Sequence, residues 1–193
     1  MEYRLSTPLQ KEKVEPLRAG DAVFISGGII VARDKAHARM AEYFRVHKEL
    51  PFDLEGAVIF HGAPIVKKED GAWKIVAIGP TTSSRMDDLE PAVIEHGAAA
   101  IVGKGGMAGR VPEALRDHGA VYLSMTGGTA VLGARMVKKV VSLIWEDLGM
   151  AEAVWLLEVE GFGPLLVTMD SHMGDLYEEV RRRVSENIKG MRI

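Results

Sequence analysis

Three short segments of the sequence have the residue types needed to bind a small anion. Each begins as an apolar run of strand type, turns in a stretch rich in glycine or hydroxyl residues, and carries a cation: FISGGIIVARD (24–34), AIGPTTSSRMD (77–87) and AIVGKGGMAGR (100–110). Glycines let a backbone come close to a ligand, and the N–H groups at the start of a following helix attract anions. We therefore expect Arg33, Arg85 and Lys104 to converge on one anionic small molecule.

The chemistry of these cations suits a carboxylate. A guanidinium is a planar fork that binds both carboxylate oxygens at once, and each charge-assisted hydrogen bond contributes about 1.5–3 kcal/mol. Taken singly, each cation is more often a plain surface charge. Thr81, Thr82 and Ser83 would equally serve as capping residues for a helix that starts near Asp87. The repetition of one design in three turns favours the ligand-binding interpretation.

Other polar residues near these turns have weaker signals. His37 follows Arg33 by one helical turn and is expected to approach the same ligand, and Asp34 is expected at the cap of that helix. The six histidines lack a tight metal-binding spacing such as HExxH, and His47, His96 and His118 are expected near helix carboxyl ends as structural residues. The stretch GGTA (127–130) fits either a ligand turn or tight packing.

A nucleotide site is the main alternative interpretation of the third turn. The stretch GKGGMA (103–108) matches G-x-G-x-x-A after a strand, which alone is a weak dinucleotide signature. The following strand, AVYLSMTGG, lacks the acidic residue that a nicotinamide site requires. A phosphate-binding P-loop is also disfavoured, because Gly105 stands where Ser or Thr should follow the lysine.

Composition narrows the class of protein. The chain has 193 residues, 47% of them apolar, a formal net charge of −3 and no cysteine. The length fits one domain spanning 1–193, and the charge gives no attraction to nucleic acid or to an anionic membrane. Without cysteine this chain has no thiolate ligand for a metal. No signal peptide or membrane-length apolar run is evident, so a cytoplasmic location is expected.

The order of elements predicts an α/β domain with a mixed sheet. Strands are expected at 22–25 and 57–62, a helix at 34–50, and a hairpin at 64–80 around the turn EDG. Strand–turn–helix alternation from 87 to 128 indicates a parallel portion. Three β-rich pieces follow from Met136, and an amphipathic helix at 175–190 ends at Gly190.

Taken together, these segments resemble a known family. STPL (6–9), AGDAVFISGGIIVARDKAH (19–37), GPTTSSRMD (79–87), GKGG (103–106) and GG (127–128) resemble, in order and spacing, the β subunit of iron–sulfur-dependent hydro-lyases. These are the class I fumarases and L-tartrate dehydratases, in some of which the same region is the carboxyl-terminal domain of one long chain. The resemblance extends from about Ser6 to Tyr177. One departure is HGAP (61–64), where an aromatic-rich stretch ending in Gly-Pro is expected.

The resemblance implies a fold, a partner and a reaction. The fold would be a single swivelling β/β/α three-layer domain that closes over an α subunit, in an assembly of α2β2 type. That partner would hold a [4Fe-4S] cluster on three cysteines, with no metal ligand in this chain. The reaction would be the reversible dehydration of a small dicarboxylate, malate to fumarate, with L-tartrate as the alternative substrate.

The resemblance also implies roles for individual residues. Thr81 would be the catalytic base, and Thr82, Arg33, Arg85 and Lys104 would bind substrate; Asp34, His37 and Gly105 are taken as supporting residues. A free threonine hydroxyl is a very poor base at neutral pH, so Thr81 needs an activating partner, on this subunit or the other. Two alternatives remain: a self-sufficient nucleotide enzyme that uses GKGGMA, and a binding or regulatory module without catalysis.

Overall fold

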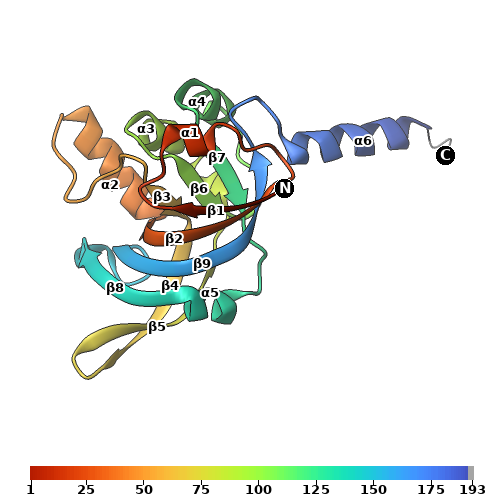
Figure 1. The fold of residues 1–193 in the computed structure, drawn as a ribbon. Helices are drawn as coiled ribbons and strands as arrows, with labels where there is room; N and C mark the ends of the chain where they lie inside the picture. The colour runs from red at the N-terminus through yellow and green to blue at the C-terminus, as the bar shows by residue number, and fades with distance from the viewer. Residues whose placement is uncertain (191–193) are drawn as a thin grey trace.

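A computed structural model describes residues 1–190 as a mixed seven-stranded sheet, a two-stranded hairpin and surrounding helices (Figure 1). The strands are β1 (Glu2–Ser6), β2 (Ala22–Val31), β3 (Val58–Phe60), β4 (Gly62–Glu69), β5 (Ala72–Pro80), β6 (Ala100–Gly103), β7 (Val121–Ser124), β8 (Val137–Ile144) and β9 (Val154–Met169). The α-helices are α1 (Lys11–Val14), α2 (Asp34–Arg45), α3 (Glu90–Glu95), α4 (Val111–His118), α5 (Ala130–Met136) and α6 (Leu176–Gly190), and the short 3₁₀ helices are η1 (Ser83–Met86) and η2 (Glu146–Leu148).

The large sheet closes on itself. Strands β2, β3, β6 and β7 are parallel neighbours, and β9 pairs antiparallel with both β7 and β2. Strand β1 lies parallel to β2, and β8 lies antiparallel to β9. The predicted α/β class with a mixed sheet is therefore confirmed.

Side chains that alternate along the strands build two cores. In β3, Val58 and Phe60 pack inside the ring of strands, whereas Ile59 faces helices α2, α3 and α4. In β7, Val121 and Leu123 pack inside and Tyr122 faces the helices. Because strand residues point alternately to opposite faces, one ring separates a β–β core from a β–α core. These layers agree with the expected β/β/α order.

Strands β2 and β9 are longer than the sequence pattern predicts. The strand expected at 22–25 continues through Gly27 and Gly28 to Val31, and β9 runs unbroken where two strands were expected. Strand β9 supplies hydrogen-bond partners along the full length of β2, since Ala22 pairs with Leu166 and Val31 with Trp155. A Cβ at Gly27 would stand 2.4 Å from the Thr7 hydroxyl, so this glycine serves close packing, not a turn.

Three helix predictions need correction. Helix α2 ends at Arg45 instead of residue 50, because His47 has a positive φ of 52° that closes the helix. The helix expected from residue 87 begins only at Glu90, as α3, and is preceded by the 3₁₀ helix η1. Helix α5 was not predicted. It crosses strand β5 where Gly133 faces the carbonyl of Ile78, an approach that no larger residue would permit.

The predicted hairpin is confirmed and explains one feature of the site. Its turn places Asp70 and Gly71 at positive φ, as two-residue hairpin turns require. Gly62 pairs with Pro80, so the residues just outside the hairpin, His61 and Thr81, are brought side by side.

The closing helix α6 is confirmed and extends away from the body of the molecule (Figure 1). None of the helices in the described part of the chain is both long and apolar enough to cross a membrane.

Candidate active site

Two of the three predicted turns, those with Arg33 and Lys104, start from one edge of the parallel strands. Arg33 follows β2, His61 follows β3 and Lys104 follows β6, and these strands are parallel neighbours. Their carboxyl ends therefore lie at the same edge of the sheet, where α/β proteins bind ligands. The sequence-based expectation that Arg33 and Lys104 occupy a common edge agrees with this topology.

The Thr81 turn joins this edge through main-chain hydrogen bonds. Thr81 N donates to His61 O at 2.6 Å, Lys104 N donates to Thr81 O at 3.3 Å, and Ser83 N donates to Lys104 O at 3.1 Å. Thr82 and Lys104 form a parallel bridge. The segment 81–83 therefore runs alongside Lys104, with Thr82 in an extended conformation. Thr82 is exposed there, at the start of η1.

The Thr81 hydroxyl is held by the main chain. Its Oγ1 donates to His61 O at 3.0 Å, and no carboxylate or imidazole of residues 1–190 bonds to it. An activating partner for Thr81 from another subunit stays a prediction.

Arg33 and Arg85 meet on one carboxylate. Arg85 donates Nε and Nη2 to the two oxygens of Asp34, at 2.6 and 2.9 Å. Arg33 donates Nε to Asp34 at 3.0 Å and pairs through Nη2 with Glu152, also at 3.0 Å. Within the described residues, Nη1 of each arginine has no partner. The two predicted cations are therefore together, each with one nitrogen available to a ligand.

Asp34 does not cap helix α2, as the sequence pattern had suggested. The N-cap residue is Arg33, and the N–H of Lys35 donates to Glu152 at 3.0 Å. The carboxylate of Asp34 instead turns to the arginines. The hydrogen bond from Arg85 holds the pKa of Asp34 well below its ordinary value, so Asp34 is ionised throughout the physiological range.

His37 supports the site from behind. Its side chain is fully buried, and its Nδ1 lies 3.2 Å from the carbonyl oxygen of Arg33. It cannot touch a ligand that lies on the exposed side of Arg33. Its Nε2 points to Glu90, which also contacts His61.

The glycines of the third turn give Lys104 an open surrounding. Gly105 is exposed with a φ of +78°, and nothing lies where its Cβ would stand. A Cβ at Gly127 would lie 4.0 Å from Lys104 Cδ, so the turn 127–130 borders this side chain. Helix α4 starts only at Val111, three residues after Ala108, so GKGGMA does not open directly into a helix as a dinucleotide fingerprint does.

The sequence reading missed Glu152, Glu90, Ser83 as a buried group, and Tyr122. His61 was noticed only as a departure from a motif. Glu152 precedes β9 and reaches Arg33 across more than a hundred residues, which no local spacing reveals. Two sequence features could have indicated buried polar residues here: the glutamate at 90 beside Pro91, and the tyrosine at 122 within an otherwise aliphatic strand.

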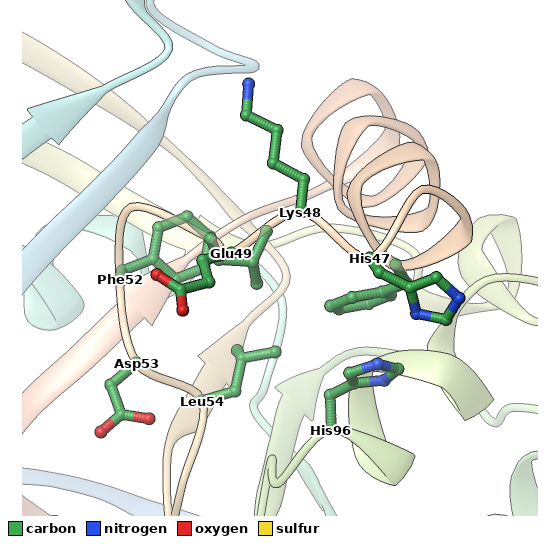
Figure 2. A pocket seen from close by; sticks show the side chains of 9 residues that line it. His47, Lys48, Glu49, Phe52, Asp53, Leu54 and His96 are labelled. Carbon is green, nitrogen blue, oxygen red and sulfur yellow. The ribbon is translucent and has the colours of Figure 1, made fainter.

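A surface hollow elsewhere does not contain the predicted residues. It lies between the end of α2 and the loop 47–54, where Lys48 points outward and His96 lies at one side (Figure 2). The His96 ring stacks on Phe44 with centroids 3.7 Å apart. His47 and His96 are thus surface and packing residues, as expected, and none of the cations at 33, 85 and 104 reaches this hollow.

Comparisons with known proteins indicate one family. The family model described as "Fumarase C-terminus" matches residues 1–180. The chain is 46% identical over 190 residues to a Methanocaldococcus jannaschii protein named "Putative L(+)-tartrate dehydratase subunit beta", with 97% of each chain covered. It is 37% identical over 187 residues to the L(+)-tartrate dehydratase subunit beta of Escherichia coli K12, covering 96% of this chain and 92% of that one. It is also 36% identical over 186 residues to the Geobacillus stearothermophilus "Putative fumarate hydratase class I", covering 95% of this chain and 35% of that protein.

Proposed function

Because the chain belongs to the fumarase C-terminus family, we propose that it is the β subunit of a hydro-lyase that reversibly dehydrates a 2-hydroxydicarboxylate. The reaction is malate to fumarate, at a site shared with a second subunit. The observation that carries this proposal is the pair Arg33 and Arg85, held together by Asp34 with a free nitrogen on each. Two fixed guanidinium groups beside a threonine turn suit a carboxylate next to the carbon that loses a proton.

Substrate binding follows from the orientation of the arginines. Asp34 and Glu152 occupy Nε and Nη2 of the guanidinium groups, so a substrate carboxylate meets Nη1. Lys104 and Thr82, both exposed at the same edge, contribute a further charge and a hydroxyl. The exposed glycine at 105 leaves room for the substrate next to Lys104.

Thr81 is proposed to take the proton. Removing a proton from the carbon beside a carboxylate places a second negative charge on that carboxylate, and cations fixed around it lower the barrier where the charge develops. In the chain alone the Thr81 hydroxyl donates to His61 O and lacks a base, so its activation is assigned to a carboxylate or cation of the partner.

The chain does not itself fit an iron–sulfur cluster, because it has no cysteine. In our proposal a [4Fe-4S] cluster belongs to the α subunit, in an α2β2 enzyme, and this chain is inactive alone. When bound there, such a cluster supplies a Lewis acid toward the leaving hydroxyl.

L-Tartrate is the second candidate substrate. It is favoured by the names of the relatives that match this chain over more than nine tenths of both lengths. Tartrate and malate both present two carboxylates, so the same arginines serve either. Anaerobic assays of the reconstituted pair with each acid decide between them.

The decisive experiment is Thr81→Ala in the enzyme reconstituted with its cluster-bearing partner. We expect kcat to fall about 10²–10⁴-fold, with KM nearly unchanged because the hydroxyl is not a carboxylate ligand. A variant with near-normal turnover would refute Thr81 as the base.

Arg85→Lys tests the carboxylate clamp. Lysine keeps the charge but cannot bond to both Asp34 oxygens and still offer a fixed N–H to the substrate, so we expect kcat/KM to fall about 10–100-fold. Arg116→Lys is the matched control, because Arg116 is an exposed arginine paired with Asp117 outside the site. Equal activity of the two lysine variants would contradict the clamp.

A further inference from the structure

Five buried polar side chains form one connected group behind the site: His37, His61, Ser83, Glu90 and Tyr122. All five are completely buried. None of them is used in the proposed reaction. Buried polar groups are costly unless they are satisfied, so a cluster of five calls for a function.

The partners of His37 decide where its protons are. Its Nδ1 lies 3.2 Å from Arg33 O, and its Nε2 lies 3.0 Å from Glu90 Oε2, an ion-pair distance without the alignment of a hydrogen bond. A carbonyl and a carboxylate both attract a proton on the facing nitrogen, so the doubly protonated ring is the form that suits both neighbours. His37 is therefore an imidazolium paired with an ionised Glu90.

The partners of His61 lead to the opposite charge state. Tyr122 donates its hydroxyl to Ser83 Oγ at 2.8 Å, which leaves the Ser83 proton for His61 Nδ1 at 2.9 Å. His61 Nε2 keeps its own proton and donates to Glu90 at 2.7 Å. His61 is thus neutral, and the group holds one positive and one negative charge.

The electrostatic surroundings agree with these states. Burial alone would raise the pKa of Glu90, but the two histidines lower it to about 2. Burial opposes the charge of His37, yet Glu90 raises its pKa above the ordinary value; burial lowers the pKa of His61. The titratable groups that face His37 are Glu90 from α3, His61 after β3, and Asp34 of its own helix.

The group contacts the main chain of both the Arg33 turn and the Thr81 turn. His37 holds the carbonyl of Arg33, and the carbonyl of His61 accepts two hydrogen bonds from Thr81, from N and from Oγ1. We propose that His37, His61, Ser83, Glu90 and Tyr122 are positioning residues, whose shared protons fix the Arg33 and Thr81 turns relative to each other. The effect of this positioning on catalysis rests on the proposed function.

A bound metal ion is disfavoured by the distances. In a tetrahedral site with metal–nitrogen bonds of 2.0–2.1 Å, ligand atoms stand about 3.4 Å apart. The Nε2–Oε2 distances here are 2.7 Å for His61, which is a hydrogen bond, and 3.0 Å for His37, and both are shorter than the ligand spacing of such a site.

The first test is nitrogen NMR of the full chain labelled in histidine, with Zn²⁺ added at the end. The other four histidines are exposed, and their ring signals serve as references. We expect His37 to keep both ring protons at pH 7, and His61 to be neutral with its proton on Nε2. A neutral His37 at pH 7, or stoichiometric shifts of both rings on adding Zn²⁺, would overturn the proposal.

The second test compares Glu90→Gln with Thr168→Val, measured by backbone amide shifts and by kinetics of the reconstituted enzyme. Thr168 is a buried hydroxyl that bonds to Ser124 outside the group. In Glu90→Gln the amides of Arg33 and Thr81 should shift together, and kcat should fall about 10–100-fold with a smaller change in KM. The kcat profile should also gain a new dependence near pH 6–8, where an ordinary imidazole titrates. Thr168→Val should leave those amides and kcat unchanged.

Tyr122→Phe provides a second variant if Glu90→Gln does not fold. Losing one neutral hydrogen bond should shift the amides of Thr81 and Ser83 and lower kcat about 3–10-fold. Loss of stability without movement of either turn, in both variants, would overturn the positioning role. A wild-type pair without hydro-lyase activity, with NMR as expected, would instead refute the proposed function alone.

Discussion

Glu90 and Asp34 are each shared by two basic side chains, and they differ in burial. Glu90 lies between His37 and His61 with no exposed surface, whereas Asp34 lies between Arg33 and Arg85 with 31% of its side chain exposed. A third case, Glu69 between Lys67 and Lys74 at the hairpin tip, is 47% exposed. The same bridge therefore occurs at three depths. We expect burial to decide whether such a bridge stabilises the fold, orients the candidate site, or does neither.

Glu90→Gln should have the largest effect on stability. Removing the charge leaves the His37 imidazolium buried without its partner, which costs about 3–5 kcal/mol of unfolding free energy. Urea unfolding at pH 6 measures this loss. A cost below that of the exposed Asp34 bridge would contradict the ranking by burial.

The pH dependence sharpens this prediction. The pKa of Glu90 is lowered to about 2 from 4.5, so its contribution is present above 4.5 and is lost as the pH falls toward 2. The pKa of His37 is raised above 6.5, so its contribution is present below 6.5 and is lost as the pH rises through the folded value. The difference between wild type and Glu90→Gln should thus be greatest near pH 5–6.5. A difference that does not vary with pH would argue against this ion pair.

Gly103→Ala should have the next largest effect. A Cβ at Gly103 would stand 1.9 Å from Ser83 Oγ and 3.1 Å from the Tyr122 hydroxyl, so the buried group must rearrange. Overpacking of this kind costs about 1–3 kcal/mol. Combining Gly103→Ala with Ser83→Ala should recover part of the loss, because the second change removes the clashing oxygen. A double variant no more stable than Gly103→Ala would exclude this clash as the cause.

Asp34→Asn should change activity more than stability. Water screens this partly exposed bridge, so the loss of unfolding free energy should be at most about 1 kcal/mol. The arginines would lose their common anchor, and we expect KM to rise in the reconstituted enzyme. An unchanged KM would mean that Asp34 does not orient Arg33 and Arg85 for substrate.

Glu69→Gln should have the smallest effect. Its partners are flexible surface lysines at the tip of the hairpin, and we expect neither the unfolding midpoint nor the activity to change measurably. A clear loss in either would show that exposure is a poor guide to the weight of such bridges.

The sequence alone was enough to predict those parts of the candidate site that lie close together in the chain. Arg33, Thr81 and Lys104 each follow a strand within a few residues, so strand–turn patterns located them. Ser83 lies in the same turn, but it was predicted to be a helix cap. The sequence does not distinguish a serine that is buried in a hydrogen-bonded group from one that caps a helix. Asp34 was wrongly predicted to cap its helix, because its partner Arg85 lies 51 residues further along the chain and local spacing does not reveal it.

The connections between these parts could not be read from the sequence. Glu90, His61 and Tyr122 meet only because β3, β6 and β7 are neighbours in a particular register. The lengths of β2 and β9 likewise depend on their mutual pairing, and glycine-rich stretches that resemble turns become strand when a partner supplies hydrogen bonds.

The closure of the ring by β9 has a consequence for how the protein is made. Ala22 pairs with Leu166, so the strand leading to Arg33 lacks this partner on the ribosome until residue 166 has been synthesised. Such long-range pairing also favours slow folding. Nascent chains that stall before the final strand would expose an unpaired β2 edge, and chaperones that recognise extended apolar segments would be their natural protectors.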